Sequence, residues 1–201
     1  MADQQITVVG QGAVAAAPDV MRLNAGVEVR EPTAGEAFAA ARAAASRLMA
    51  ALAAAGVSTR DLRTNELSLG PEYEAYPKVA AYRAAQGVEA VVRDLSQADQ
   101  VIDTVAGVGE EARLNGVTFE LSDPAAALRD ARARAFLDAR AKAVQYAELA
   151  GRPLGPVLSI SEEVLGGPQP VMMAAAAMEK SSISPGEQSV SVGVRVVYAF
   201  A

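Results

Sequence analysis

The sequence predicts an α+β fold in which a mostly antiparallel sheet carries three helices on one face. Segments with apolar residues at every second position alternate with segments of helical periodicity, in the order β-β-α-β-β-α-β-α-β-β. Neighbouring strands follow one another closely, which favours antiparallel pairing, and their one-sided alternation places the helices on one face. We therefore expect a single domain over residues 5–200.

Two strands are expected at the amino terminus, over residues 5–16 and 19–30. In the second strand, apolar side chains share one face and mostly polar side chains occupy the other. The apolar set is Met21, Leu23, Ala25, Val27 and Val29. This pattern is typical of a strand that is buried on one side and solvated on the other.

A long helix follows the second strand. Thr33 and Glu36 have the spacing of a capping box, and Gly56 supplies the left-handed residue that ends many helices. An apolar stripe runs between these signals, formed by Phe38, Ala41, Ala45, Leu48, Met49 and Leu52. Together they predict a helix that runs to Ala55.

The remaining elements follow from the same two periodicities. We expect further strands over residues 62–73, 80–93, 117–121, 157–164 and 188–200, and helices over residues 97–106 and 124–150. Residues 165–187 are rich in Gly, Pro, Met, Ala and Ser and have neither period. We expect a flexible insert at about 166–184 and interpret Met172 and Met173 as part of it, rather than as an oxidisable sensor.

The amino-acid inventory excludes several classes of site. The chain has no His and no Cys, which excludes the usual zinc sites, histidine triads and cysteine nucleophiles. We therefore predict no catalytic residue, no metal and no cofactor. The net charge of −6 disfavours binding to nucleic acid, because an acidic surface repels phosphate backbones.

The amino terminus lacks the basic and apolar regions of a signal peptide. The longest alanine-rich segment carries Glu36, Arg42 and Arg47, so we expect no transmembrane segment. These observations predict a cytoplasmic protein, or a periplasmic or cell-surface one if a leader has been removed.

Gly10, Gly12 and Ala15 have the spacing of a dinucleotide-binding turn. Such a turn needs a helix that begins within the glycine motif and directs its amide groups at the pyrophosphate. Pro18 and the strand after it leave no room for that helix. We therefore interpret the glycines as a bulge or bend in a hairpin arm.

Two groups of charged residues are candidates for a functional site. Adjacent carboxylates in a strand point to opposite faces, so we expect Glu72, Glu74, Glu162 and Glu163 to be solvated rather than to form a cation site or an acid–base pair. The long helix mixes basic and acidic residues at helical spacing, which favours a salt-bridged face over a phosphate groove. Its basic residues include Arg129, Arg132, Arg140 and Lys142.

Four stretches resemble the SIMPL domain family: ITVVGQGAVAAAPD, AYRAAQGVEAVVRDLSQADQVID, ARARAFLDARAKAVQYAELAGRPLG and ISPGEQSVSVGVRVVY. The resemblance implies an α+β fold and self-assembly. Some exported members are surface immunogens that form ring- or channel-like oligomers, others are tied to oxidative-stress tolerance, and the animal member is an adaptor of a signalling kinase. No catalytic motif defines the family.

The leading hypothesis is a non-enzymatic homo-oligomeric scaffold or binding protein whose partner is a second copy of itself. The alternatives are a channel- or chamber-forming oligomer and a stress-linked enzyme with an unidentified cofactor. The long first helix is unusually rich in alanine on the face opposite its apolar stripe. Alanine is the strongest helix former, so one explanation is helix propensity together with codon bias. The other, which the family resemblance favours, is that small side chains let a neighbouring subunit approach closely. The predicted interface residues are Ala39, Ala43, Ala50, Ala54, Tyr198 and Phe200.

Overall fold

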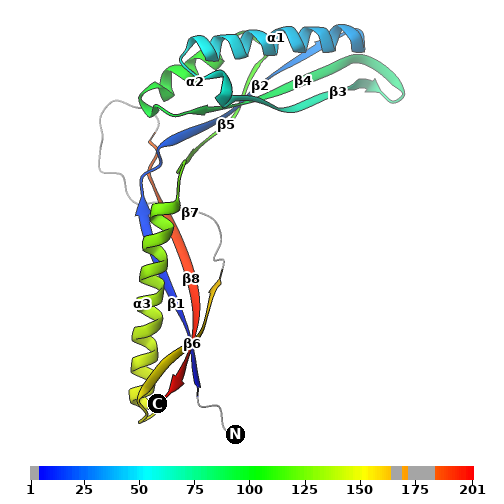
Figure 1. Ribbon diagram of the computed structural model, residues 1–201. Helices are drawn as coiled ribbons and strands as arrows, with labels where there is room; N and C mark the ends of the chain where they lie inside the picture. The colour runs from blue at the N-terminus through cyan, green and yellow to red at the C-terminus, as the bar shows by residue number, and fades with distance from the viewer. Residues whose placement is uncertain (1–4, 164–168, 172–183) are drawn as a thin grey trace. The chain divides into compact units, whose positions relative to one another are not determined.

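The computed structural model describes residues 5–163, 169–171 and 184–201, which form two compact units (Figure 1). Unit 1 contains residues 5–18, 121–163, 169–171 and 186–201, and unit 2 contains residues 19–120 with residues 184–185. Apart from residues 169–171 and Ser184, the predicted insert at 166–184, with Met172 and Met173, lies outside the described residues.

The predicted α+β class and element order are confirmed. The elements are β1 (Gln5–Ala16), β2 (Val20–Glu31), α1 (Ala34–Ala54), η1 (Thr59–Asp61), β3 (Leu62–Ala75), β4 (Lys78–Val92), η2 (Leu95–Gln97), α2 (Ala98–Ala106), β5 (Ala112–Glu120), α3 (Ala125–Leu149), β6 (Leu154–Glu163), the short β7 (Gln169–Val171) and β8 (Glu187–Phe200). The described strands form two antiparallel sheets, where the sequence suggested one, because β1 pairs with β8 instead of with β2.

Unit 1 is a sheet in the order β1-β8-β6, with β7 also paired to β8, and α3 packs against β1 and β8 (Figure 1). The β1–β8 register runs from Gln5 opposite Ala199 to Ala16 opposite Gln188 without a shift. The interpretation of Gly10 and Gly12 as a bulge in a hairpin arm is therefore wrong.

The two glycines instead allow α3 to approach β1. A Cβ atom added to Gly10 would lie 2.0 Å from the carbonyl oxygen of Ala135, and one added to Gly12 would lie 2.1 Å from that of Ala131. The helix presents alanine at every fourth position to the strand, namely Ala131, Ala135, Ala139, Ala143 and Ala147, all buried. Small residues on both elements bring their backbones together.

The outer edge of β1 is also covered by α3. Asp138 accepts a hydrogen bond from the backbone N–H of Gln11 at 2.8 Å, and Lys142 donates one to the carbonyl oxygen of Val9 at 3.0 Å. Arg134 donates to the carbonyl oxygen of Ala13 at 2.8 Å. These contacts occupy backbone groups that an unpaired edge strand would offer to another chain.

Unit 2 is a sheet in the order β3-β4-β2-β5, with α1 and α2 packed on one face (Figure 1). The predicted apolar face of β2 is confirmed: Met21, Leu23, Ala25 and Val27 are buried, and Val29 packs against a smaller cluster. Leu48 and Leu52 of α1 and Val101 and Val105 of α2 complete this core.

The predicted ends of α1 are confirmed. Thr33 is the N-cap, and its hydroxyl oxygen accepts a hydrogen bond from the backbone N–H of Glu36 at 3.3 Å. Gly56 follows the helix in the left-handed region at φ +100°. Among the described helices, α1 is long and apolar enough to cross a membrane by length and composition, contrary to the expectation from its charges. Its inner face packs on the sheet through Leu48 and Leu52, as in the core helix of a globular unit.

Candidate functional site

The predicted interface residues of α1 form an exposed apolar surface. Ala39, Ala43, Ala50 and Ala54 are all exposed, on the side of the helix opposite its buried residues. We call these four residues the alanine face. Arg47 lies at one margin and is drawn into an ion pair with Glu111, which precedes β5. The four alanines carry no charge, and the exposed charged residues of α1 are Glu36, Arg42 and Arg47.

The other two interface candidates belong to unit 1, not to the unit that contains α1. Tyr198 is 4% exposed and lies in the core beneath α3, so the structure places its side chain away from the surface. The hydroxyl group of Tyr198 is buried with no hydrogen-bond partner among the described residues, and burial raises its pKa. Phe200 is partly buried, and the guanidinium group of Arg152 lies 4.3 Å from the centre of its ring.

Two exposed leucines lie on β3, an edge strand of unit 2. Leu67 is 56% exposed and Leu69 is 47% exposed. Leu67 pairs with Gln86, and Leu69 with Ala84. Because Ala84 packs against α1 residues, the two leucines point to the side of the sheet that carries α1. Their alternation in the sequence is the signal that could have identified this surface.

An ion-pair row crosses the opposite face of the same sheet, with one residue from each strand. Arg63 of β3 contacts Glu89 of β4 at 2.9 Å, and Glu89 also pairs with Arg22 of β2. Arg22 in turn donates two hydrogen bonds to Glu120 of β5, at 2.9 and 2.8 Å. We call Arg63, Glu89, Arg22 and Glu120 the ion-pair row. The ion-pair row depends on which strands lie side by side in the sheet. The periodicity of the sequence does not reveal that order.

Glu89 is the buried member of the ion-pair row, at 7% exposure. The hydrogen bond from Arg63, helped by the one from Arg22, holds the pKa of Glu89 below its ordinary value despite burial. The Arg22 hydrogen bonds likewise lower the pKa of Glu120, and the two carboxylates raise that of Arg22. Glu89, Glu120 and Arg22 are therefore charged at neutral pH, and the arrangement stabilises the sheet rather than supplying a proton donor.

The carboxylates singled out in the sequence each lie beside a basic group. Glu72 pairs with Arg30 at 2.8 Å, Glu74 with Lys78 at 2.5 Å, Glu162 with Arg132 at 2.8 Å and Glu163 with Arg195 at 2.5 Å. Lys142 of α3 is salt-bridged to Asp138 one helical turn earlier, as predicted, whereas Arg132 pairs with Glu162 of β6. Within the described part of the chain, no three or more Asp or Glu side chains are grouped so that they could hold a metal ion.

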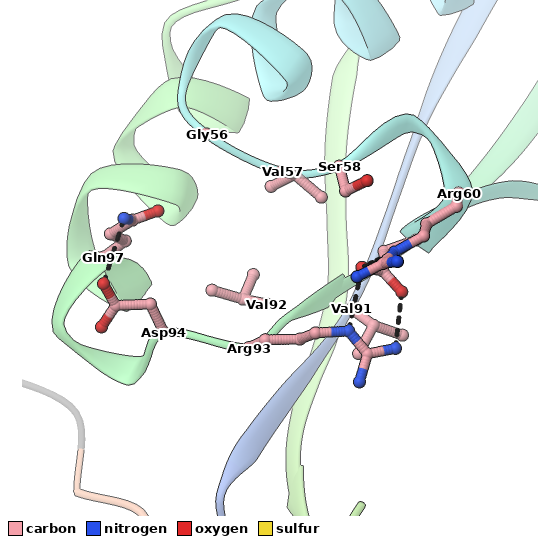
Figure 2. A pocket seen from close by; sticks show the side chains of 10 residues that line it. Gly56, Val57, Ser58, Arg60, Val91, Val92, Arg93, Asp94 and Gln97 are labelled. Carbon is pink, nitrogen blue, oxygen red and sulfur yellow. Dashed lines mark hydrogen bonds and ion pairs between the residues drawn. The ribbon is translucent and has the colours of Figure 1, made fainter.

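A pocket of about 170 Å³ opens in unit 2 between the end of α1, η1, the end of β4 and η2 (Figure 2). Its floor is formed by Val57 and Val92, both buried. Figure 2 shows Arg60 and Arg93 on one side of these valines and Asp94 and Gln97 on the other. We call this cavity the dipolar pocket, because its two walls carry opposite charge.

Hydrogen bonds fix both walls of the dipolar pocket. Arg93 donates two bonds to Asp61, at 3.0 and 2.7 Å, and these hold the pKa of Asp61 below its ordinary value. Asp94 accepts bonds from the hydroxyl and the backbone N–H of Ser96, at 2.6 and 3.0 Å, and from Gln97 at 3.1 Å. The Ser96 bonds lower the pKa of Asp94, so this carboxylate is ionised at neutral pH.

The glycine motif of β1 does not form a dinucleotide-binding turn. Residues 10–15 lie within the continuous strand β1, and the space a Cβ atom would take at Gly10 and Gly12 is filled by the backbone of α3. The described residues thus define a two-sheet α+β protein with an exposed alanine face, an ion-pair row and the dipolar pocket.

Comparison with known proteins then places the chain in a family. The model of the SIMPL family, described as a protein of unknown function (DUF541), matches residues 6–198. The chain belongs to this family. It is 32% identical to the 26 kDa periplasmic immunogenic proteins of Brucella melitensis and Brucella abortus, over 96% of this chain and 84% of each relative. Because these relatives are periplasmic, the cytoplasmic expectation is not supported.

Similarity to solved structures is low. Crystal structures of AtUAH in complex with (S)-hydroxyglycine and with glyoxylate align at a TM-score of 0.26 and 16% identity, over 70% of this chain and 34% of theirs. A likeness of this size carries no argument about the fold or the function of the chain.

Proposed function

We propose that this chain is a non-enzymatic periplasmic protein that assembles into a homo-oligomer and acts as a scaffold or binding protein. The observation that carries the proposal is the alanine face of α1, an apolar helix surface left exposed on unit 2. The periplasmic immunogenic relatives support the compartment and offer no enzymatic name. A role in stress tolerance stays a prediction from the family resemblance.

The alanine face is suited to a close contact between helices. Alanine loses no side-chain entropy when it is buried, and its small size lets two backbones approach. Arg47 is held by Glu111 at the margin of this face. A glutamate- or lysine-rich face, as on an ordinary surface helix, would have to be desolvated on association, whereas the alanine face carries little of that cost.

The free energies show that burial of the alanine face must be joined by burial of further apolar surface for two copies to associate. Burial of four methyl groups from each of two copies contributes about 6 kcal/mol at ~0.8 kcal/mol per group. Association itself costs about 4–15 kcal/mol in lost translational and rotational freedom. Leu67 and Leu69, exposed on the same side of the unit 2 sheet, supply the further apolar surface in our proposal.

Native mass spectrometry of the purified chain tests the proposal against both alternatives. A homo-oligomer whose mass is a whole multiple of 20.7 kDa, with no additional bound mass, is the expected result. A closed ring with an internal channel would appear as one large, discrete stoichiometry. A cofactor bound in stoichiometric amount would contradict the non-enzymatic proposal, and a monomer at micromolar concentration would contradict assembly.

A further inference from the structure

The dipolar pocket of unit 2 combines an apolar floor with charged groups of both signs. Arg60 and Arg93 stand on one wall, and Asp94 stands on the opposite wall (Figure 2). With Asp61 included, two cationic and two anionic side chains line it, so their formal charges cancel. A ligand with a single charge would therefore match one wall and meet the opposite one without a partner.

The size of the dipolar pocket limits its occupant. A volume of about 170 Å³ is smaller than the ~300–1,000 Å³ typical of pockets for drug-sized ligands. The floor of Val57 and Val92 takes a short aliphatic group, because burial of such a group against apolar side chains is favourable. The occupant is thus a small molecule with one aliphatic branch.

The two walls can bind different charged groups of that molecule. Arg60 approaches Asp61 at 3.7 Å, too far for a strong hydrogen bond, and its side chain is 78% exposed, so it keeps donors for a carboxylate. Ser58 also lines the cavity and adds a hydroxyl group. Asp94 is held in place by Ser96 and Gln97, and a carboxylate oxygen accepts more than one hydrogen bond, so it can take one from an ammonium group.

We propose that the dipolar pocket binds a small zwitterion of the α-amino-acid class, with its carboxylate at Arg60 and Arg93, its ammonium at Asp94 and its aliphatic side chain on Val57 and Val92. This site lies within unit 2 and does not depend on assembly of the chain. It would give the protein a small-molecule ligand in addition to a partner subunit.

Titration of the ¹⁵N-labelled full chain with L-valine, followed by amide chemical shifts, tests the proposal. Two probes that each lack one charge serve as ligand controls: 3-methylbutanoate has no ammonium group, and isobutylamine has no carboxylate. We expect saturable shifts at Ser58 and Asp94 with L-valine and at least tenfold weaker binding of both probes, because each leaves one charged wall unpaired, a loss of about 1.4 kcal/mol or more.

Two variants remove one wall each. Arg60→Met and Asp94→Asn should each weaken L-valine binding at least tenfold; asparagine retains the capping geometry at position 94, so the fold is kept. Arg129→Met, at an exposed residue of α3 in the other unit, is the matched control and should bind like the parent chain. Unchanged amide spectra away from the pocket verify folding of each variant.

Three results would overturn the proposal. One is the lack of a saturable chemical-shift change with L-valine up to about 20 mM. A dissociation constant above that concentration is too weak for specific binding. Another is equal binding of 3-methylbutanoate and L-valine, which would define a plain anion site. The third is parent-like affinity in both folded wall variants.

Discussion

Gly10 of β1 faces the backbone of Ala135 in α3 so closely that a Cβ atom on the glycine would lie 2.0 Å from the carbonyl oxygen. Gly12 stands in the same relation to Ala131, one helical turn earlier. Glycines two residues apart on a strand thus match alanines four residues apart on a helix. The glycine motif that resembles a cofactor-binding loop therefore serves packing: it lets α3 lie directly against the sheet of unit 1.

This contact predicts a large effect of a single methyl group. Gly12→Ala should lower the free energy of unfolding of unit 1 by about 3 kcal/mol or more, because backbone atoms of α3 cannot move aside as a flexible side chain would. Urea unfolding followed by circular dichroism measures the loss, and amide exchange of β1 and β8 assigns it to unit 1.

Gly35→Ala is the matched control for that substitution. Gly35 lies in the first turn of α1, and a Cβ atom there meets nothing within 4 Å. Alanine should stabilise the helix by up to about 1 kcal/mol. If Gly12→Ala unfolded at the same urea concentration as the parent chain, the close approach of α3 to β1 would be disproved.

The same contact shows what the sequence could and could not predict. Periodicity and capping signals located nearly every element, because the alternation of β2 and the Thr33 cap depend on neighbours in the chain. The pairing of β1 with β8 depends on residues far apart in the sequence, and no local pattern encodes it. Local sequence therefore suggests a bulge at Gly10, although its close contact with α3 determines its role.

Sites that depend on strand order cannot be predicted from local sequence patterns, for the same reason. Arg63, Glu89, Arg22 and Glu120 come from four strands, and only the sheet order β3-β4-β2-β5 aligns them. Tyr198, an interface candidate because it lies near the end of the long apolar strand, is buried in the core beneath α3.

The ion-pair row yields a second prediction. Glu89→Gln should destabilise unit 2 by about 2 kcal/mol, because Arg22 and Arg63 lose a largely buried anionic partner while Arg22 keeps Glu120. Chemical denaturation monitored by circular dichroism checks it. Glu74→Gln removes an exposed pair with Lys78 and should change stability by less than about 0.5 kcal/mol. Equal effects of the two substitutions would show that burial of Glu89 contributes nothing.

The ion-pair row also predicts how stability depends on pH. Arg63 and Arg22 hold the pKa values of Glu89 and Glu120 below the ordinary 4.5, so the unfolded chain binds more protons than the folded one as the pH falls. Their stabilisation is complete above that value and is lost as the pH falls through the lowered folded-state pKa values. Urea midpoints measured from neutral to acidic pH should follow this course.

Glu89→Gln with Glu120→Gln provides the control for the pH profile. The double variant should be less stable at neutral pH and lose less stability on acidification, since two of the titrating groups are gone. A profile as steep as that of the parent chain would assign the acid sensitivity to other carboxylates, such as Asp61.

The central claim, assembly through the alanine face, is tested most directly by the mass of Ala43→Glu/Ala50→Glu in multi-angle light scattering. Both positions are exposed in the single chain, where glutamate is well tolerated on a helix, but an apolar interface would have to bury its charge. We expect the parent chain at several times 20.7 kDa and the double variant at a lower mass, with unchanged helical circular dichroism. A parent chain that is monomeric at micromolar concentration, or an oligomer of the same mass in both proteins, would contradict the claim.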